Sequence, residues 1–169
     1  NLNEINSFEE WEQLYKKLVF WELELESSND ATMSEILDAQ KMEANQQFGR
    51  FIEKFYPDWF EDHQAPVMSH TLFKNKIAEE LSDSQPTLLI VIDNLRYDQW
   101  KTLEPTVNTY YKTQEESLYY SILPTATQYA RNALFSGLMP SVFGNEHRNL
   151  ARSRSTVSKA IPLGIDTFF

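Results

Sequence analysis

The sequence has 169 residues, of which 41% are apolar and 14% aromatic, so the chain can bury a core and is not a disordered segment. Its formal net charge of -10 argues against binding of a nucleic-acid duplex, because an acidic surface repels phosphates. The absence of cysteine excludes thiol catalysis, disulfides and cysteine-ligated zinc and agrees with a cytoplasmic location. The longest apolar run, Leu88–Ile92, is too short to span a bilayer.

Two amphipathic helices are predicted in the first third of the chain. Ser7 and Glu10 have the spacing of a capping box, and apolar residues with a helical period follow them. Thr32 and Glu35 predict a second capping box, and the helix that it begins should end before Pro57. A short polar turn between the two helices favours an antiparallel hairpin. Its core is expected to contain Trp11, Leu14, Leu18, Phe48, Ile52 and Phe55.

A polar segment over 82–86 is predicted to separate two parts of the chain. A third helical stretch over 70–81 precedes it. We therefore expect a helical bundle domain over residues 1–84 and an α/β domain over residues 85–169. From residue 144 onward no clear period is visible, and these residues are not assigned to any element.

Alternating strands and helices are predicted in the second part. Residues 87–92 form an apolar run typical of a strand that is buried on both faces of a parallel sheet. A helix over 98–111, interrupted by Pro105, and a second strand over 117–122 follow. A helix over 128–136 comes next. This order is typical of an α/β fold, and we expect the two strands to be parallel in one sheet.

Two polar residues follow the predicted strands at their carboxyl ends, where ligands bind in open α/β sheets. Asp93 comes directly after the first strand, and Thr127 lies at the start of the helix after the second. A carboxylate and a hydroxyl near a helix N-terminus suit a divalent metal and a phosphate. Spacing alone also allows Asp93 to be an ordinary strand-end residue and Thr127 to be an ordinary helix N-cap.

The segments Ile92–Arg96 and Leu123–Pro140 resemble the PglZ branch of the alkaline-phosphatase superfamily. The resemblance implies a domain with an alkaline-phosphatase-like α/β sheet that holds two zinc ions. It implies that Asp93 is a metal ligand and that Thr127 is both the nucleophile and a ligand that bridges the metals. Thr125, in the same turn, is the less favoured nucleophile.

The segments Phe20–Glu26 and Pro66–Leu72 resemble the middle of PorX-type response regulators, in which a receiver precedes a helical domain and a PglZ output domain. This resemblance implies a two-component system with a sensor kinase and regulatory protein partners, a homodimer, and a link to type IX secretion. The substrate would be a phosphate ester, most plausibly a diester, or a nucleotide.

The expected metal ligands are incomplete in this sequence. After Thr127 the only acidic or histidine residues are Glu146, His147 and Asp166, and they do not have the family's spacing. We therefore expect the chain to be a fragment of a zinc-dependent phosphatase or phosphodiesterase and to be inactive by itself. The alternative is a non-catalytic regulatory module that binds partners or nucleotides and dimerises through its helices.

Overall fold

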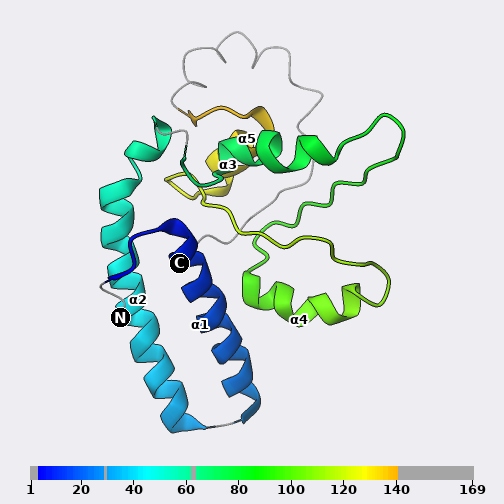
Figure 1. The fold of residues 1–169 in the computed structure, drawn as a ribbon. Helices are drawn as coiled ribbons and strands as arrows, with labels where there is room; N and C mark the ends of the chain where they lie inside the picture. Colours follow the sequence, from blue (N-terminus) through cyan, green and yellow to red (C-terminus); the bar gives the residue numbers. More distant parts are fainter. Residues whose placement is uncertain (1–3, 29, 62–63, 141–169) are drawn as a thin grey trace. The chain divides into compact units, whose positions relative to one another are not determined.

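The computed structural model describes residues 4–28, 30–61 and 64–140 (Figure 1). Its helical elements, in chain order, are α1 (Phe8–Ser28), α2 (Ala31–Phe55), a 3₁₀ turn (Asp58–Phe60), α3 (Ser69–Leu72), a π turn (Phe73–Ile77), a second 3₁₀ turn (Ala78–Glu80), α4 (Tyr97–Val107) and α5 (Thr127–Ser136). No helix in the described ranges is both long enough and apolar enough to cross a membrane.

The chain divides into two compact units, each of which is discontinuous in sequence. The first unit joins the residues up to Pro66 to the segment Tyr97–Leu118, so it contains α1, α2 and α4. The second unit joins Val67–Arg96 to the described residues from Tyr119 onward, so it contains α3 and α5.

Both long helices begin at side-chain caps, one of which was predicted correctly. At α1, the Glu10 N–H donates to Ser7 Oγ at 3.2 Å and the Ser7 N–H donates to Glu10 Oε2 at 3.3 Å, which confirms the capping box. At α2, the cap is Asp30, whose Oδ1 accepts from a first-turn N–H at 3.0 Å. The predicted box at Thr32 and Glu35 is therefore wrong, because a carboxylate two residues earlier already occupies the position and is favoured by the helix dipole.

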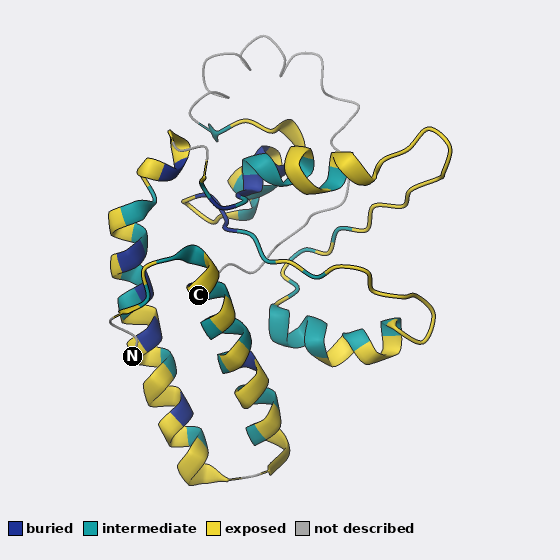
Figure 2. Cartoon of the chain, in the orientation of Figure 1, coloured by how far each residue is buried: buried dark blue, intermediate teal, exposed yellow. Residues whose placement is uncertain are grey.

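α1 and α2 form an antiparallel hairpin whose buried residues face the opposite helix (Figures 1 and 2). Trp11 and Phe48 are 2% and 3% exposed, and their ring centroids lie 5.2 Å apart. Phe51 completes this cluster at 5.9 Å from Trp11. The predicted contact between Trp11 and Phe48 is confirmed, but Phe51 is the buried neighbour, whereas Ile52 and Phe55 are half-buried.

The predicted α/β sheet is wrong for the part of the chain that the structure describes, which contains isolated bridges and no named strand. Residues 87–92 form neither a helix nor a strand, and all of them except Val91 are exposed, with Leu88 at 81% and Ile90 at 69%. Tyr120, in the second predicted strand, instead forms a parallel bridge with Met68. A strand buried on both faces needs neighbouring strands and covering helices, and the described residues supply neither to 87–92.

The two helices after the apolar run are close to the predicted ones. α4 spans Tyr97–Val107 and ends earlier than expected, with Pro105 in its last turn. α5 spans Thr127–Ser136 and ends as predicted at Gly137, which has a left-handed φ of 69°. α5 packs beside α3 within the second unit (Figure 1). A Cβ added at Gly137 would lie 3.6 Å from the backbone oxygen of His70.

Candidate functional site

Thr127 is the first residue of α5, and its side chain is half-buried. Ala126 occupies the N-cap position and makes no side-chain capping bond. The interpretation of Thr127 as an ordinary N-cap is therefore wrong. The first backbone N–H groups of any helix have no partner within it, so the hydroxyl of Thr127 lies at a helix end that favours anions.

Buried backbone contacts anchor the segment that leads to Thr127. Tyr120 donates its N–H to Val67 O at 2.9 Å and accepts from the Ser69 N–H at 3.0 Å. Ile122, which is fully buried, donates its N–H to Ser69 Oγ at 3.1 Å. Ser69 is the first residue of α3, and α3 packs against α5. The segment before Thr127 is therefore anchored to α3.

Asp93 follows the exposed apolar run and is itself half-buried. Its Oδ1 atom is buried and has no hydrogen-bond partner among the described residues. The next residue, Asn94, has a positive φ of 58°, a conformation that Asn tolerates better than most residues. A buried carboxylate oxygen without a donor is costly, and binding to a cation would satisfy it.

The residues present fit part of a zinc site. A carboxylate oxygen and a threonine hydroxyl are oxygen donors, which zinc accepts beside nitrogen and sulfur. Asp93 and Thr127 belong to the same compact unit, but a common ion bound by both remains a prediction. The described ranges contain no cluster of three or more His, Asp or Glu side chains suited to a metal. Glu146, His147 and Asp166 lie outside the described residues.

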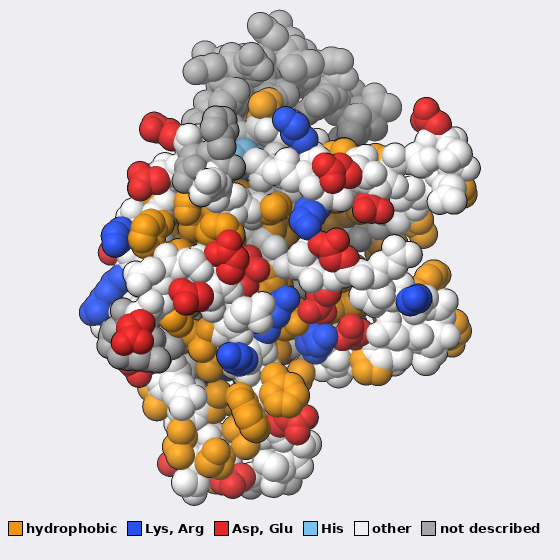
Figure 3. Space-filling view, viewed as in Figure 1, with side chains coloured by type: hydrophobic (Ala, Val, Ile, Leu, Met, Phe, Trp, Pro, Cys, Tyr) orange, Lys and Arg blue, Asp and Glu red, His pale blue; other side chains and the backbone are white. Residues whose placement is uncertain are grey.

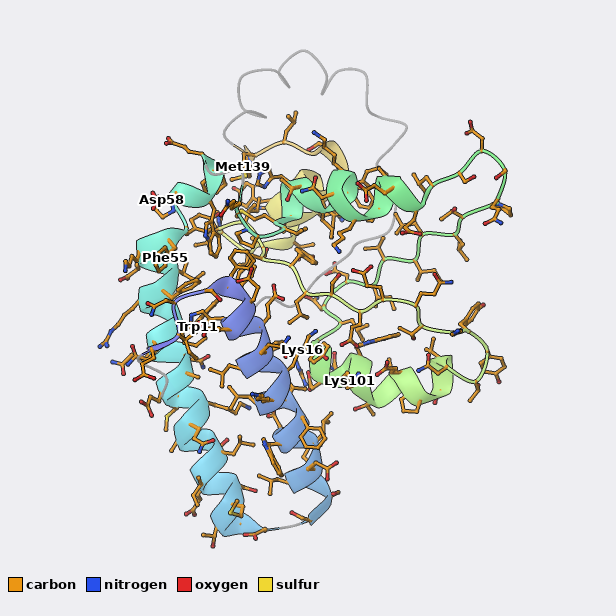
Figure 4. The ribbon with its side chains drawn as sticks, viewed as in Figure 1. Trp11, Lys16, Phe55, Asp58, Lys101 and Met139 are labelled. Carbon is orange, nitrogen blue, oxygen red and sulfur yellow. The ribbon has the colours of Figure 1, made fainter. Side chains whose placement is uncertain are left out.

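A polar cluster in the first unit was not predicted. The Glu116 carboxylate accepts from Tyr97 Oη at 2.7 Å, Trp100 Nε1 at 3.1 Å and Lys101 Nζ at 3.2 Å. Lys16 Nζ of α1 lies 4.0 Å from the same carboxylate, and Figure 4 shows Lys16 and Lys101 on the facing helices. The sequence signal for this cluster is the spacing of its three hydrogen-bond donors, Tyr97, Trp100 and Lys101, which places them on one face of α4.

Burial and hydrogen bonding act in opposite directions on this cluster. Burial raises the pKa of the Glu116 carboxyl, but hydrogen bonds from Tyr97, Lys101 and Trp100 together outweigh it, so the pKa lies below its ordinary value. Burial and the hydrogen bond to Glu116 both raise the pKa of Tyr97. The donors therefore stay protonated and the acceptor stays ionised at neutral pH. This cluster positions α4 against α1 and offers no unused group for chemistry.

Two family models match the chain in succession. The PorX response regulator linker domain matches residues 1–60. The BREX system PglZ alkaline phosphatase-like domain matches residues 72–160, just over half of the chain, and this range includes both Asp93 and Thr127. No curated protein matches the chain. The order of the two matches is that of a response regulator with a PglZ output domain. The predicted domain boundary at residues 84–85 stays a prediction.

Proposed function

We propose that this chain, which belongs to the PglZ family of alkaline phosphatase-like domains, is part of a response regulator whose output domain hydrolyses phosphodiesters with zinc. The observation that carries the proposal is the position of Thr127, a hydroxyl on the first residue of α5 within the PglZ match. The buried, unpartnered Oδ1 of Asp93 in the same match supports a cation nearby.

In the proposed reaction, the Thr127 oxygen attacks phosphorus while the bond from phosphorus to the leaving ester oxygen breaks. The covalent intermediate is a phospho-threonine that still carries the other ester group of the substrate, and water then breaks its bond to Thr127, which releases a phosphate monoester and regenerates the hydroxyl. N–H groups at the start of α5 face the charge that grows on the phosphoryl oxygens. Asp93 and Thr127 would hold zinc, which, when bound, favours the ionised hydroxyl and neutralises phosphoryl charge.

A pair of threonines in one turn gives a matched test in the complete protein. With bis(p-nitrophenyl) phosphate as the substrate, Thr127→Ala should lower turnover by at least about 10³-fold, because it removes the nucleophile. Thr125→Ala, two residues earlier, should keep most of the activity. Asp93→Ala should lower zinc content, measured by atomic absorption, together with turnover. Wild-type turnover by Thr127→Ala would show that the nucleophile assignment is wrong.

The proposed cellular setting follows from the PorX-like linker match in front of the PglZ match. We propose a cytoplasmic regulator that a sensor kinase controls and that acts with partner proteins in type IX secretion. A test is to delete the gene and to measure secretion with the wild-type gene or the Thr127→Ala variant restored. Rescue by the wild type alone would support a catalytic role, and rescue by both would favour a binding role.

A second candidate function is a non-catalytic module that binds partners or nucleotides and dimerises through its helices. It is favoured by two neighbouring aromatic side chains on α1, Phe20 and Trp21, which are 55% and 54% exposed and have ring centroids 5.4 Å apart. Figure 3 shows apolar side chains gathered on one face of the hairpin. If Trp21→Ser converts a homodimer to a monomer in sedimentation velocity while turnover persists, the protein dimerises through its helices but is not a non-catalytic module.

A further inference from the structure

α4 is covered much less than the two long helices of the first unit. The structure describes all 11 of its residues, and none of them is buried. In contrast, α1 buries Trp11 and Val19, and α2 buries Phe48 and Phe51. Figure 2 shows the same difference along the three ribbons. Packing of an apolar face supplies most of the stability of a helix in a protein, so α4 is expected to open more easily than the hairpin.

Polar contacts to one carboxylate fasten α4 to the segment that follows it. Glu116 accepts hydrogen bonds from Tyr97, Trp100 and Lys101, and it lies 19 residues after Tyr97. These bonds therefore close the loop that α4 begins. The side chains of Lys101 and Glu116 are 32% and 25% exposed, so water competes for the same groups and each contact contributes little.

The same carboxylate also faces the hairpin. Lys16 Nζ of α1 lies 4.0 Å from Glu116 Oε1, and both side chains are about one-quarter exposed. The rings of Tyr15 and Tyr97 add a contact between α1 and α4, with centroids 5.7 Å apart. An ion pair this accessible to water is weak and is screened by salt. Loss of the charge at Glu116 should therefore loosen α4 from α1 and leave the aromatic core of the hairpin intact.

We propose that α4 is a releasable latch, which docks on the hairpin through the Glu116 carboxylate and detaches while α1 and α2 stay paired. α1 lies in the match to the PorX response regulator linker domain, and α4 lies in the match to the PglZ domain. The latch therefore joins the linker to part of the output domain. Because its attachment depends on charge, a partner that competes for Lys16 or Glu116 would release it.

The test is backbone amide hydrogen exchange of the 169-residue chain, followed by NMR under conditions where the rate reports the opening equilibrium. Amides 101–107 report on α4, and amides 44–51 report on α2. In the wild type, α4 should exchange at least about 10-fold faster than α2, because local opening needs less free energy than opening of the hairpin. Glu116→Gln should speed exchange in α4 by roughly another 10-fold, the usual loss for a charge-assisted contact, and leave α2 unchanged. Raising NaCl to about 1 M should speed α4 roughly 2- to 5-fold.

A second carboxylate in the same unit supplies the matched control. Glu22 pairs with Lys41 at 2.5 Å between α1 and α2, so Glu22→Gln makes the same chemical change away from the latch and should leave exchange in α4 unchanged. On the hairpin side, Lys16→Gln should speed exchange in α4, and Lys16→Arg, which keeps the charge, should restore the slower rate. If Glu116→Gln does not fold, the two Lys16 variants decide.

Three results would overturn the latch. Equal exchange rates in α4 and α2 of the wild type would mean that α4 opens only together with the hairpin. Equal acceleration of both helices by Glu116→Gln would mean that the carboxylate stabilises the whole unit. Acceleration of α4 by Glu22→Gln as large as that by Glu116→Gln would mean that no specific contact holds the helix. Exchange is measured without zinc or substrate, so none of these results depends on the role of Thr127.

Discussion

Replacing Phe48 by Ala should be among the most destabilising single changes in the helical hairpin. Phe48 is 3% exposed, and its ring centroid lies 5.2 Å from that of Trp11 and 6.2 Å from that of Phe51. Burial of such a side chain is worth about 1.5–3 kcal/mol, and each aromatic pair adds about 0.5–1.5 kcal/mol. With the cavity left behind, the expected loss is about 3–5 kcal/mol.

Phe20→Ala is the matched control, because it removes the same side chain from the same hairpin at a position that is 55% exposed. Its cost should be within about 0.5 kcal/mol. The free energy of unfolding is measured by urea titration with far-UV circular dichroism. For a chain of this length, Phe48→Ala should lower the melting temperature by about 2–4 °C per kcal/mol. Equal losses in the two variants would refute the packing described for α1 and α2.

Four further substitutions test three local features by the same urea titration. Asp30→Ala should lower the free energy of unfolding by about 0.5–2 kcal/mol because it removes the α2 cap, whereas Thr32→Ala should change it little. A larger loss in Thr32→Ala than in Asp30→Ala would support the predicted capping box at Thr32 and Glu35. Burial raises the pKa of the Glu116 carboxyl, but hydrogen bonds from Tyr97 and its other α4 partners outweigh burial and bring the pKa below 4.5. The ionised Glu116 therefore stabilises the folded protein above pH 4.5, and this stabilisation is lost as the pH falls through the lower pKa of the folded state. Tyr97→Phe should reduce this acid dependence, and an unchanged profile would contradict the assignment. Gly137→Ala should cost about 1–2 kcal/mol because its φ is 69°, and no loss would mean that the left-handed cap is not required.

The hairpin was predictable because its signals are local. The capping box at Ser7 and the stop before Pro57 each involve residues within one turn of a helix end. The start of α2 was placed wrongly because Asp30 and Thr32 are both good capping residues, and only the backbone at residue 30, which is extended, distinguishes them.

The sheet was not predictable from the apolar run, because composition favours an extended chain without choosing its partner. Residues 87–92 form no strand, and all of them except Val91 are exposed. Tyr120 pairs instead with Met68, which lies far away in sequence, just before the helical stretch predicted over 70–81. Pairings at such separation depend on tertiary packing, to which β-propensity is highly sensitive.

The candidate site was predictable only as far as the family motif extends. The motif gave Asp93 and Thr127, and the structure adds the buried Oδ1 and the helix start. The Glu116 cluster was missed because its acceptor and donors are joined by a loop rather than by one helix.

The discontinuity of the first unit has a consequence for the order of folding. α1 and α2 are neighbours in sequence and can form their hairpin early, because local contacts close short loops. α4 can join them only after the intervening segment Val67–Arg96 has been looped out, which carries an entropic cost that local pairing does not. Docking of α4 through Lys16, Tyr97 and Glu116 is therefore expected to follow hairpin formation, and during synthesis the hairpin can emerge from the ribosome complete before α4 exists.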